Sequence, residues 1–379
     1  MEKLANYLFE NEISNSYLHL NINFNDVIKV IDSIVEEEKK SDSRKDTAQI
    51  RVYSEGNTAL FDNEIRTCSV DSYSSLEEWG SSIFKGNKYG VVFNRCEKWN
   101  DELTCKIATV IKDIYKNVIL DDVKFEITLF IGNYGWTPFG VHIDDKNSSV
   151  IHFHLGPGSK KMFTWKQDNF IKLTGSNRSF FEPEKILKDA DSVCINSNDI
   201  FILPPNKYHI GYTPEFSVAI AVAVIDDNTK KRNANALKWA ISNESWVTKN
   251  IEKRIVLNEF IKKSYKSFDL AKKSNFCFQD PPRMLDIQSK NIEHHSKLVL
   301  CKPFKIYLNK IDKNKIEIYF RGRSITVNHS KEVENMIKII NRGYPFSIIN
   351  LFEELCKEKE SIVDILKVLL SGRAIKIYE

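Results

Sequence analysis

Two histidines and one aspartate in the middle of the chain have the residue types and the spacing of a metal site. His142 and Asp144 are separated by one residue, and His209 lies 65 residues after Asp144. Residues two apart on a β-strand point to the same side, so the first imidazole and the carboxylate can converge. Two histidines and one carboxylate form the facial triad that binds Fe(II) and leaves coordination positions open. We therefore expect His142, Asp144 and His209 to be metal ligands.

A lysine follows this pair in a tight turn. The turn Gly156-Pro157-Gly158 leads through Ser159 to Lys160, at the start of a β-rich run. A basic side chain there could hold a dicarboxylate through a charged hydrogen bond. A turn lysine is also commonly solvated, and the residues of the turn alone do not distinguish these two interpretations.

The elements that must position these side chains are short strands. β-rich runs separated by Gly, Pro and Asn predict strands at 125–131, 149–155, 161–165, 192–195, 199–203 and 216–224. Many short strands with turn signals are typical of a barrel or a sandwich. The run 218–224 is apolar on both faces, which indicates a strand covered on both sides.

Helical patterns flank this strand-rich region. Apolar periodicity predicts helices at 24–38, 75–84 and 101–115 before it, and at 235–247 and 249–271 after it. The last 80 residues predict strands at 305–308, 315–320, 324–327 and 374–378, with helices at 333–340, from near 347, and at 362–370. We expect three regions: 1–225 with a β core at 124–225, a helical region at 226–296, and a domain at 297–379 with the layout of a winged helix.

The motifs together resemble the JmjC-type cupin oxygenases, which use Fe(II) and 2-oxoglutarate. The resemblance is carried by His142-Ile143-Asp144, by the turn that precedes Lys160, and by the segment 198–209 that ends in His209. It is closest to the bacterial ribosomal-protein hydroxylases that have a C-terminal winged helix. The resemblance implies a mainly β catalytic core, a double-stranded β-helix or jelly-roll cupin with flanking helices. It also implies an α-helical dimerisation region and a C-terminal winged-helix domain.

The resemblance assigns roles to individual residues. His142, Asp144 and His209 match the iron ligands, and Lys160 matches the basic residue that binds the distal carboxylate of 2-oxoglutarate. The carboxylate ligand favours hydroxylation, because halogenating relatives lack it. Some relatives contact the cosubstrate with an Asn and a Tyr on the preceding strand. Those positions correspond here to Thr128, which can donate a hydrogen bond, and to Phe130, which cannot.

The strand that follows the His-x-Asp pair carries two further histidines. His152 and His154 stand where relatives have apolar residues and a Gln. Either one of them lines a substrate pocket or both are ordinary polar residues of a strand, and we favour the second interpretation. Ala219, Ala221 and Ala223 alternate along the strand after His209, which indicates a small apolar wall near the metal or simple barrel packing.

The composition is that of a soluble globular protein with an uneven charge. The chain has 379 residues, 42% of them apolar, and no apolar run of the length that a membrane span needs. The acidic N-terminus is unlike a secretory signal, so we expect a cytoplasmic protein. The net charge of +4 combines −9 over residues 1–229, +7 over 230–296 and +6 over 297–379. Such asymmetry can reflect partners of opposite sign, or surfaces that drifted in charge.

These observations favour an enzyme that uses Fe(II), 2-oxoglutarate and O₂ to hydroxylate a side chain of a basic protein or peptide, releasing succinate and CO₂. One alternative is a tailoring oxygenase that acts on a peptide natural product. Another is a non-enzymatic regulator that binds nucleic acid through its winged helix. The helix at 362–370 is mostly apolar, so we disfavour nucleic-acid binding. The helical region 226–296 could form a homodimer or present a solvated basic face on a monomer.

Overall fold

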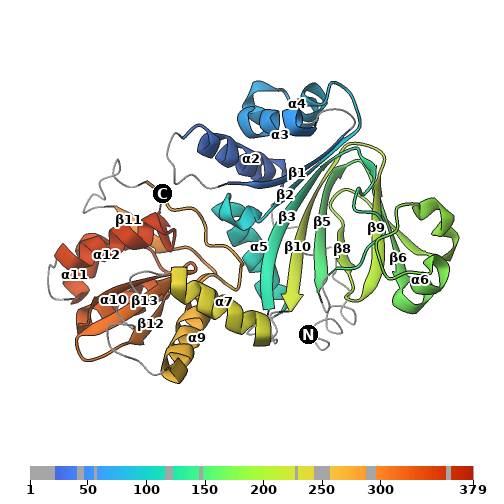
Figure 1. Cartoon of the computed structure of the whole chain (residues 1–379). Coiled ribbons are helices and arrows are strands. Elements are labelled where there is room, and N and C mark those ends of the chain that lie inside the picture. Colours follow the sequence, from blue (N-terminus) through green and yellow to red (C-terminus); the bar gives the residue numbers. More distant parts are fainter. Residues whose placement is uncertain are drawn as a thin grey trace. The chain divides into compact units, whose positions relative to one another are not determined.

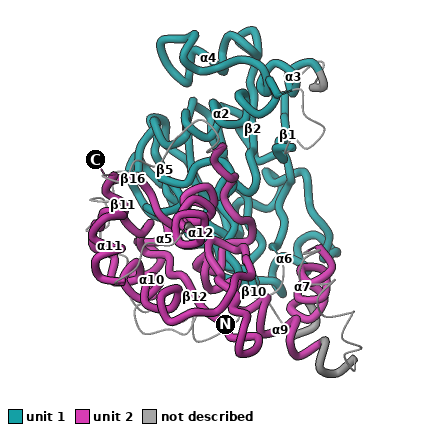
Figure 2. The backbone as a smooth tube through the Cα atoms, turned by 90° about the vertical axis from the view of Figure 1, so that its left-hand side faces the viewer, with its two compact units in different colours: residues 1–106, 123–226 teal, residues 107–122, 227–379 magenta. Residues whose placement is uncertain are grey.

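The computed structural model divides the chain into two compact units. It describes residues 22–40, 47–54, 58–115, 123–144, 148–226, 229–242, 257–286, 296–355 and 360–378. The first unit comprises residues 1–106 and 123–226, and the second comprises 107–122 and 227–379 (Figure 2). Among the described residues, no helix combines the length and the apolarity that crossing a membrane requires.

The first unit is built on two antiparallel sheets (Figure 1). The six-stranded sheet has the order β1 (Gln49–Ser54), β2 (Tyr89–Asn94), β3 (Val123–Gly132), β10 (Ser217–Asp226), β5 (Ser149–Pro157) and β8 (Ile200–Leu203). The four-stranded sheet has the order β4 (Gly135–Trp136), β9 (Lys207–Thr213), β6 (Lys160–Lys166) and β7 (Asp191–Ile195). This arrangement confirms the mainly β core that the strand pattern predicted.

Strand β3 shows how the sequence positions the face that bears the candidate site. Its residues alternate between fully buried and partly buried along the strand. Phe125, Ile127 and Leu129 are completely buried on one face. Because successive side chains on a strand point to opposite sides, Thr128 and Phe130 share the other face. That face lines a cavity described below.

Helices flank the six-stranded sheet at its β1 end and the four-stranded sheet near β6. Helix α2 (Phe24–Glu38) begins with a capping box between Asn23 and Asp26. It is followed by α3 (Thr58–Thr67) and α4 (Leu76–Ile83), with the 3₁₀ turn η2 (Val70–Ser72) between them. Helix α6 (Gln167–Thr174) lies beside β6 (Figure 1). The remaining elements are η3 (Cys96–Lys98), η4 (Pro183–Lys185), η5 (Leu187–Asp189) and α5 (Asp101–Ile114), which crosses from the first unit into the second.

A small hydrophobic cluster packs behind the four-stranded sheet. Phe170 of α6 stacks on Tyr208 of β9, with ring centroids 3.7 Å apart. The Trp165 indole N–H donates to the carbonyl of Ile186 at 3.2 Å. Val141 and Ile210 complete the centre of this cluster, and both are almost fully buried. The cluster therefore anchors the segments on either side of His142 and His209.

The second unit contains helices and two three-stranded sheets. Its helices are α7 (Thr229–Ser242), α9 (Leu257–Ser274), α10 (Lys331–Asn341), α11 (Ile348–Leu355) and α12 (Glu360–Ser371). Its sheets are β12 (Tyr307–Lys310), β13 (Lys315–Phe320) and β14 (Arg323–Asn328), and β15 (Phe346–Ser347), β11 (Lys297–Leu300) and β16 (Ile375–Ile377). Arg232 of α7 pairs with Asp269 of α9 at 2.6 Å. The three helices and four strands expected after residue 297 are present, while their assignment as a winged helix stays a prediction.

Candidate active site

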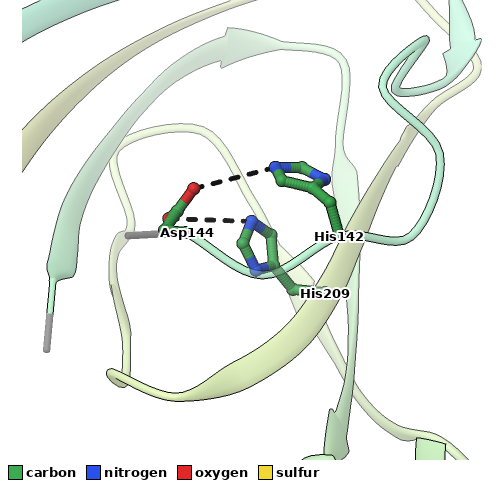
Figure 3. Close-up of side chains that lie close together, drawn as sticks. All are labelled: His142, Asp144 and His209. Atoms are coloured by element: carbon green, nitrogen blue, oxygen red, sulfur yellow. Dashed lines mark ion pairs between the residues drawn. The ribbon is translucent and has the colours of Figure 1, made fainter. Parts of the chain in front are cut away.

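The three side chains expected to be metal ligands lie together in the first unit (Figure 3). Their ligand atoms are all within 4.8 Å of one another. The Asp144 carboxylate faces both rings from one side, with Oδ1 3.7 Å from Nε2 of His142 (Figure 3). Its Oδ2 lies 3.9 Å from Nε2 of His209. One oxygen and two nitrogens thus face a common point.

Backbone pairing brings the two histidines together. The His142 N–H donates to the carbonyl of His209 at 3.1 Å, and the His209 N–H donates back at 2.8 Å. The sequence analysis placed His142 and Asp144 on one strand. In the structure only Val141 and His142 make bridge pairs, and Asp144 follows in a segment without regular structure. His209, expected at the end of a turn, is the third residue of β9.

Along β9, side chains that anchor the strand alternate with residues that face the cavity. Tyr208 and Ile210 are buried in the cluster behind the sheet. The Tyr208 hydroxyl also donates to the carbonyl of Asn177 at 2.8 Å. His209 and Gly211, at the intervening positions, face the cavity. A one-residue shift in register would exchange these two sets, so burial of the anchors holds His209 on the ligand side.

Hydrogen bonds orient both imidazoles. Nδ1 of His142 lies 3.0 Å from the carbonyl of Gly140, and Nδ1 of His209 lies 3.3 Å from that of Lys207. A carbonyl can only accept, so Nδ1 carries the hydrogen and the Nε2 lone pair is left for a metal. Burial, with the adjacent His142, lowers the pKa of His209 and favours the neutral ring that metals bind. This donor set fits Fe(II).

A cavity of about 480 Å³ opens beside the three ligands, between the two sheets. This volume lies within the range of small-molecule sites, about 300–1,000 Å³. The six-stranded sheet contributes Thr128, Phe130 and His152 to the lining, and the four-stranded sheet contributes Lys160 and Gly211. The cavity is therefore large enough to hold a small dicarboxylate next to the metal ligands.

Lys160 places a cation in this cavity. The residue is only 4% exposed. Its Nζ donates to the Tyr134 hydroxyl at 3.3 Å and lies 5.1 Å from the centre of the Phe130 ring. Among the described residues, no carboxylate forms an ion pair with it. A buried ammonium without a counter-charge is costly, which favours an anionic ligand at this point.

Gly211 and Tyr134 were not among the predicted site residues. A Cβ on Gly211 would lie 2.7 Å from Cε of Lys160 and 3.0 Å from Oγ1 of Thr137. Only glycine leaves the room that the lysine side chain occupies. The available signal was the position of Gly211, two residues after His209 and so on the same side of β9.

Some of the other residues singled out in the sequence line the cavity, and others lie outside its lining. Thr128 lines the cavity beside Phe130, and Ala221 and Ala223 line it as well, whereas Ala219 does not. His152 lines it, and the lining does not include His154. Nε2 of His154 instead lies 2.7 Å from the carbonyl of Gly158, in the turn before Lys160. The roles suggested for these residues stay predictions.

The two antiparallel sheets form a cupin-type β fold, as the motifs predicted, with two histidines and one carboxylate gathered at one place in it. A similar solved structure is the ribosomal oxygenase YcfD from Escherichia coli in complex with cobalt and succinic acid. It has 12% sequence identity and a TM-score of 0.50, and the match covers 97% of this chain and 92% of that one. The complex of YcfD from E. coli with cobalt and 2-oxoglutarate is also similar, at 12% identity and a TM-score of 0.45, over 77% and 79% of the two chains.

Comparisons based on sequence add no relative. No family model matches the chain, and no curated protein matches it. At 12% identity, the likeness to YcfD defines the fold alone. Any statement about activity therefore depends on the side chains of this chain.

Proposed function

We propose that the chain is an Fe(II)- and 2-oxoglutarate-dependent oxygenase that hydroxylates a side chain of a protein or peptide. The observation that carries the proposal is the triad of His142, Asp144 and His209, with the buried Lys160 in the cavity beside it. A three-ligand metal site and a buried cation provide for the two ends of a 2-oxo dicarboxylate. When bound, iron with 2-oxoglutarate and O₂ supplies the oxidant that inserts oxygen into a C–H bond, releasing succinate and CO₂.

The chain's own residues position the reactants. His142, Asp144 and His209 would hold Fe(II) through three protein ligands, a set that leaves coordination positions available for the cosubstrate and O₂. Lys160 binds the distal carboxylate and thereby orients the 2-oxo acid group toward the metal. Thr128 adds a hydroxyl to the same cavity. Ala221 and Ala223 form a wall of small side chains that leaves room for the substrate.

The proposal is tested by anaerobic titration with Fe(II) and 2-oxoglutarate, followed by measurement of succinate after admission of air. Wild-type protein is compared with His142→Ala, which removes a metal ligand, and with Lys160→Ala, which removes the cation. We expect metal binding to be lost in the first variant. In the second we expect metal binding to be kept and 2-oxoglutarate binding to be weakened. A wild-type protein that binds neither Fe(II) nor 2-oxoglutarate would refute the proposal.

The charge distribution supports a basic substrate. Residues 1–229 carry a net charge of −9, which attracts cationic polypeptides. We therefore propose a basic protein or peptide in the cytoplasm as the substrate. Incubation with ribosomal proteins and basic peptides, followed by mass spectrometry, should show a product heavier by one oxygen atom. Hydroxylation only of a peptide encoded by a neighbouring gene would instead identify a tailoring oxygenase.

For the rest of the chain we propose structural roles. We propose that residues 226–296 form a homodimer contact and that residues 297–379 form a winged-helix domain that packs rather than reads bases. In α12 the apolar residues Ile362, Leu366 and Leu369 are buried in the core of the second unit. Sedimentation of the full chain tests the dimer. A salt-dependent shift of DNA mobility would contradict the packing role.

A further inference from the structure

Strand β5 carries two buried histidines in different surroundings. His152 is 6% exposed and lines the cavity, whereas His154 is 1% exposed and lies outside the lining. His154 bonds the Gly158 carbonyl through Nε2, and its Nδ1 is buried without a partner but does not belong to a residue that lines the cavity. Nε2 of His152 is buried and has no hydrogen-bond partner in the structure. A buried polar atom without a partner is costly and calls for an explanation, such as a ligand.

The register places His152 opposite Thr128 across a gap. Ala221 of β10 pairs with Thr128 of β3 on one side and with His152 of β5 on the other. Directly paired residues in antiparallel strands project from the same face. Two strand spacings separate Thr128 from His152, about 10 Å between their backbones. The small side chain of Ala221 leaves the space between these two polar side chains open.

The cation of Lys160 faces this row from the other sheet. Both Lys160 and His152 lie next to Phe130, at 5.1 Å from Nζ to the ring centre and 6.4 Å between ring centres. Burial, and then the charge of Lys160, lowers the pKa of His152 well below its usual value. The imidazole is therefore neutral and has one N–H to donate. A carboxylate that accepts from both groups would satisfy the buried ammonium and the orphaned ring nitrogen together.

We propose that His152 is a binding residue for the cosubstrate, donating from Nε2 to the distal carboxylate that Lys160 also binds. It thereby supplies the side-chain donor that Phe130 cannot supply on β3. The inference rests on the proposed function, since it specifies how that same cavity holds a 2-oxo dicarboxylate. It also distinguishes the two histidines of β5, because His154 only supports the turn before Lys160.

The experiment compares two probes on the full chain loaded with Mn(II). 2-Oxoglutarate has the distal carboxylate, while 2-oxobutyrate has the same 2-oxo acid group without it. Dissociation constants are measured by calorimetry for wild type, His152→Leu and His152→Gln, with His329→Gln, a histidine outside the lining of this cavity, as the control. We expect His152→Leu to weaken 2-oxoglutarate binding at least fivefold and to leave 2-oxobutyrate binding unchanged. His152→Gln, which keeps an N–H donor, should recover part of the 2-oxoglutarate affinity, and His329→Gln should bind both probes as wild type does.

The outcomes separate this inference from the proposed function. If wild type binds 2-oxoglutarate and His152→Leu binds it equally well, the role of His152 is refuted and the oxygenase proposal stands. If His152→Leu weakens the binding of 2-oxoglutarate and of 2-oxobutyrate equally, the role of His152 is also refuted, because the lost contact would then not be to the distal carboxylate. If wild type binds neither probe, the proposed function itself fails. His152→Gln keeps the test valid should His152→Leu not fold.

Discussion

Adding one methyl group at Gly211 should weaken cosubstrate binding without unfolding the protein. In Gly211→Ala the new Cβ would lie 2.7 Å from Cε of Lys160, whereas ordinary van der Waals contact begins at 3.4 Å. The lysine end must therefore move by at least about 0.7 Å, the difference between these two distances. Cε is near the end of a flexible side chain, so the movement costs little stability. The movement displaces the Lys160 ammonium from its proposed partner, the distal carboxylate of 2-oxoglutarate.

The size of the effect follows from the hydrogen bond that is disturbed. A hydrogen bond to a charged group contributes about 1.5–3 kcal/mol. Loss of roughly half of that, about 0.75–1.5 kcal/mol, raises the dissociation constant of 2-oxoglutarate about four- to thirteenfold. The assay is calorimetric titration of the Mn(II)-loaded protein, together with its melting temperature. We expect the affinity to fall while the melting temperature stays near that of wild type.

Gly80→Ala is the matched control for this prediction. Gly80 lies in α4, outside the cavity lining, and its added Cβ would lie 2.0 Å from the hydroxyl oxygen of Tyr89. Tyr89 is buried and stacks on Phe84, so it cannot move aside as a lysine can. This variant should lower the melting temperature and leave 2-oxoglutarate affinity unchanged. The reasoning is refuted if Gly211→Ala binds 2-oxoglutarate as tightly as wild type.

Three further predictions concern the metal, the buried histidines and the second unit. Asp144→Ala should reduce Co(II) or Fe(II) affinity at least a hundredfold, read by equilibrium dialysis, because it removes the only carboxylate of the triad. Burial lowers the pKa values of His152 and His154 in the folded chain, so below pH 6.5 the unfolded chain binds protons that the folded one does not. Stability should therefore fall as pH decreases from 6.5, by about 1.4 kcal/mol per pH unit for each such histidine. His154→Leu should flatten this slope in denaturant titrations at several pH values; an unchanged slope would contradict the assignment. Ser330→Ala removes the N-cap of α10 and should destabilise the second unit by about 1 kcal/mol, without any change in 2-oxoglutarate affinity.

Strong local patterns made much of the fold predictable. The helix 24–38 was predicted with its observed bounds because apolar residues recur in it at helical spacing. The six strands expected at 125–131, 149–155, 161–165, 192–195, 199–203 and 216–224 were predicted to within a few residues, whereas β4 and β9 were not predicted as strands. β1, α3 and α6 were missed, and each gives a weak signal. β1 is an edge strand without fully buried residues, and in α6 only Phe170 is buried.

The grouping of His142, Asp144 and His209 was predictable from residue type and spacing, whereas the rest of the candidate site depends on pairing between distant segments. The functions of Gly211 and Tyr134 arise only when β9, β6 and the end of β3 come together around Lys160. The difference between His152 and His154 likewise has no local cause. Their spacing of two residues predicts the same face of β5, but His154 lies outside the cavity lining, as does its strand partner Ala219.

The paired backbone hydrogen bonds between His142 and His209 hold these two candidate ligands together although they lie 67 positions apart in the sequence. The segment from the end of β6 to the start of β7, which carries α6, η4 and η5, lies between the two histidines in sequence. Residues can be added to or exchanged in the exposed parts of this segment while the bridge keeps the ligand geometry. This connection is therefore a natural insertion point, where a recognition element could be grafted and substrate choice redirected with the same catalytic centre.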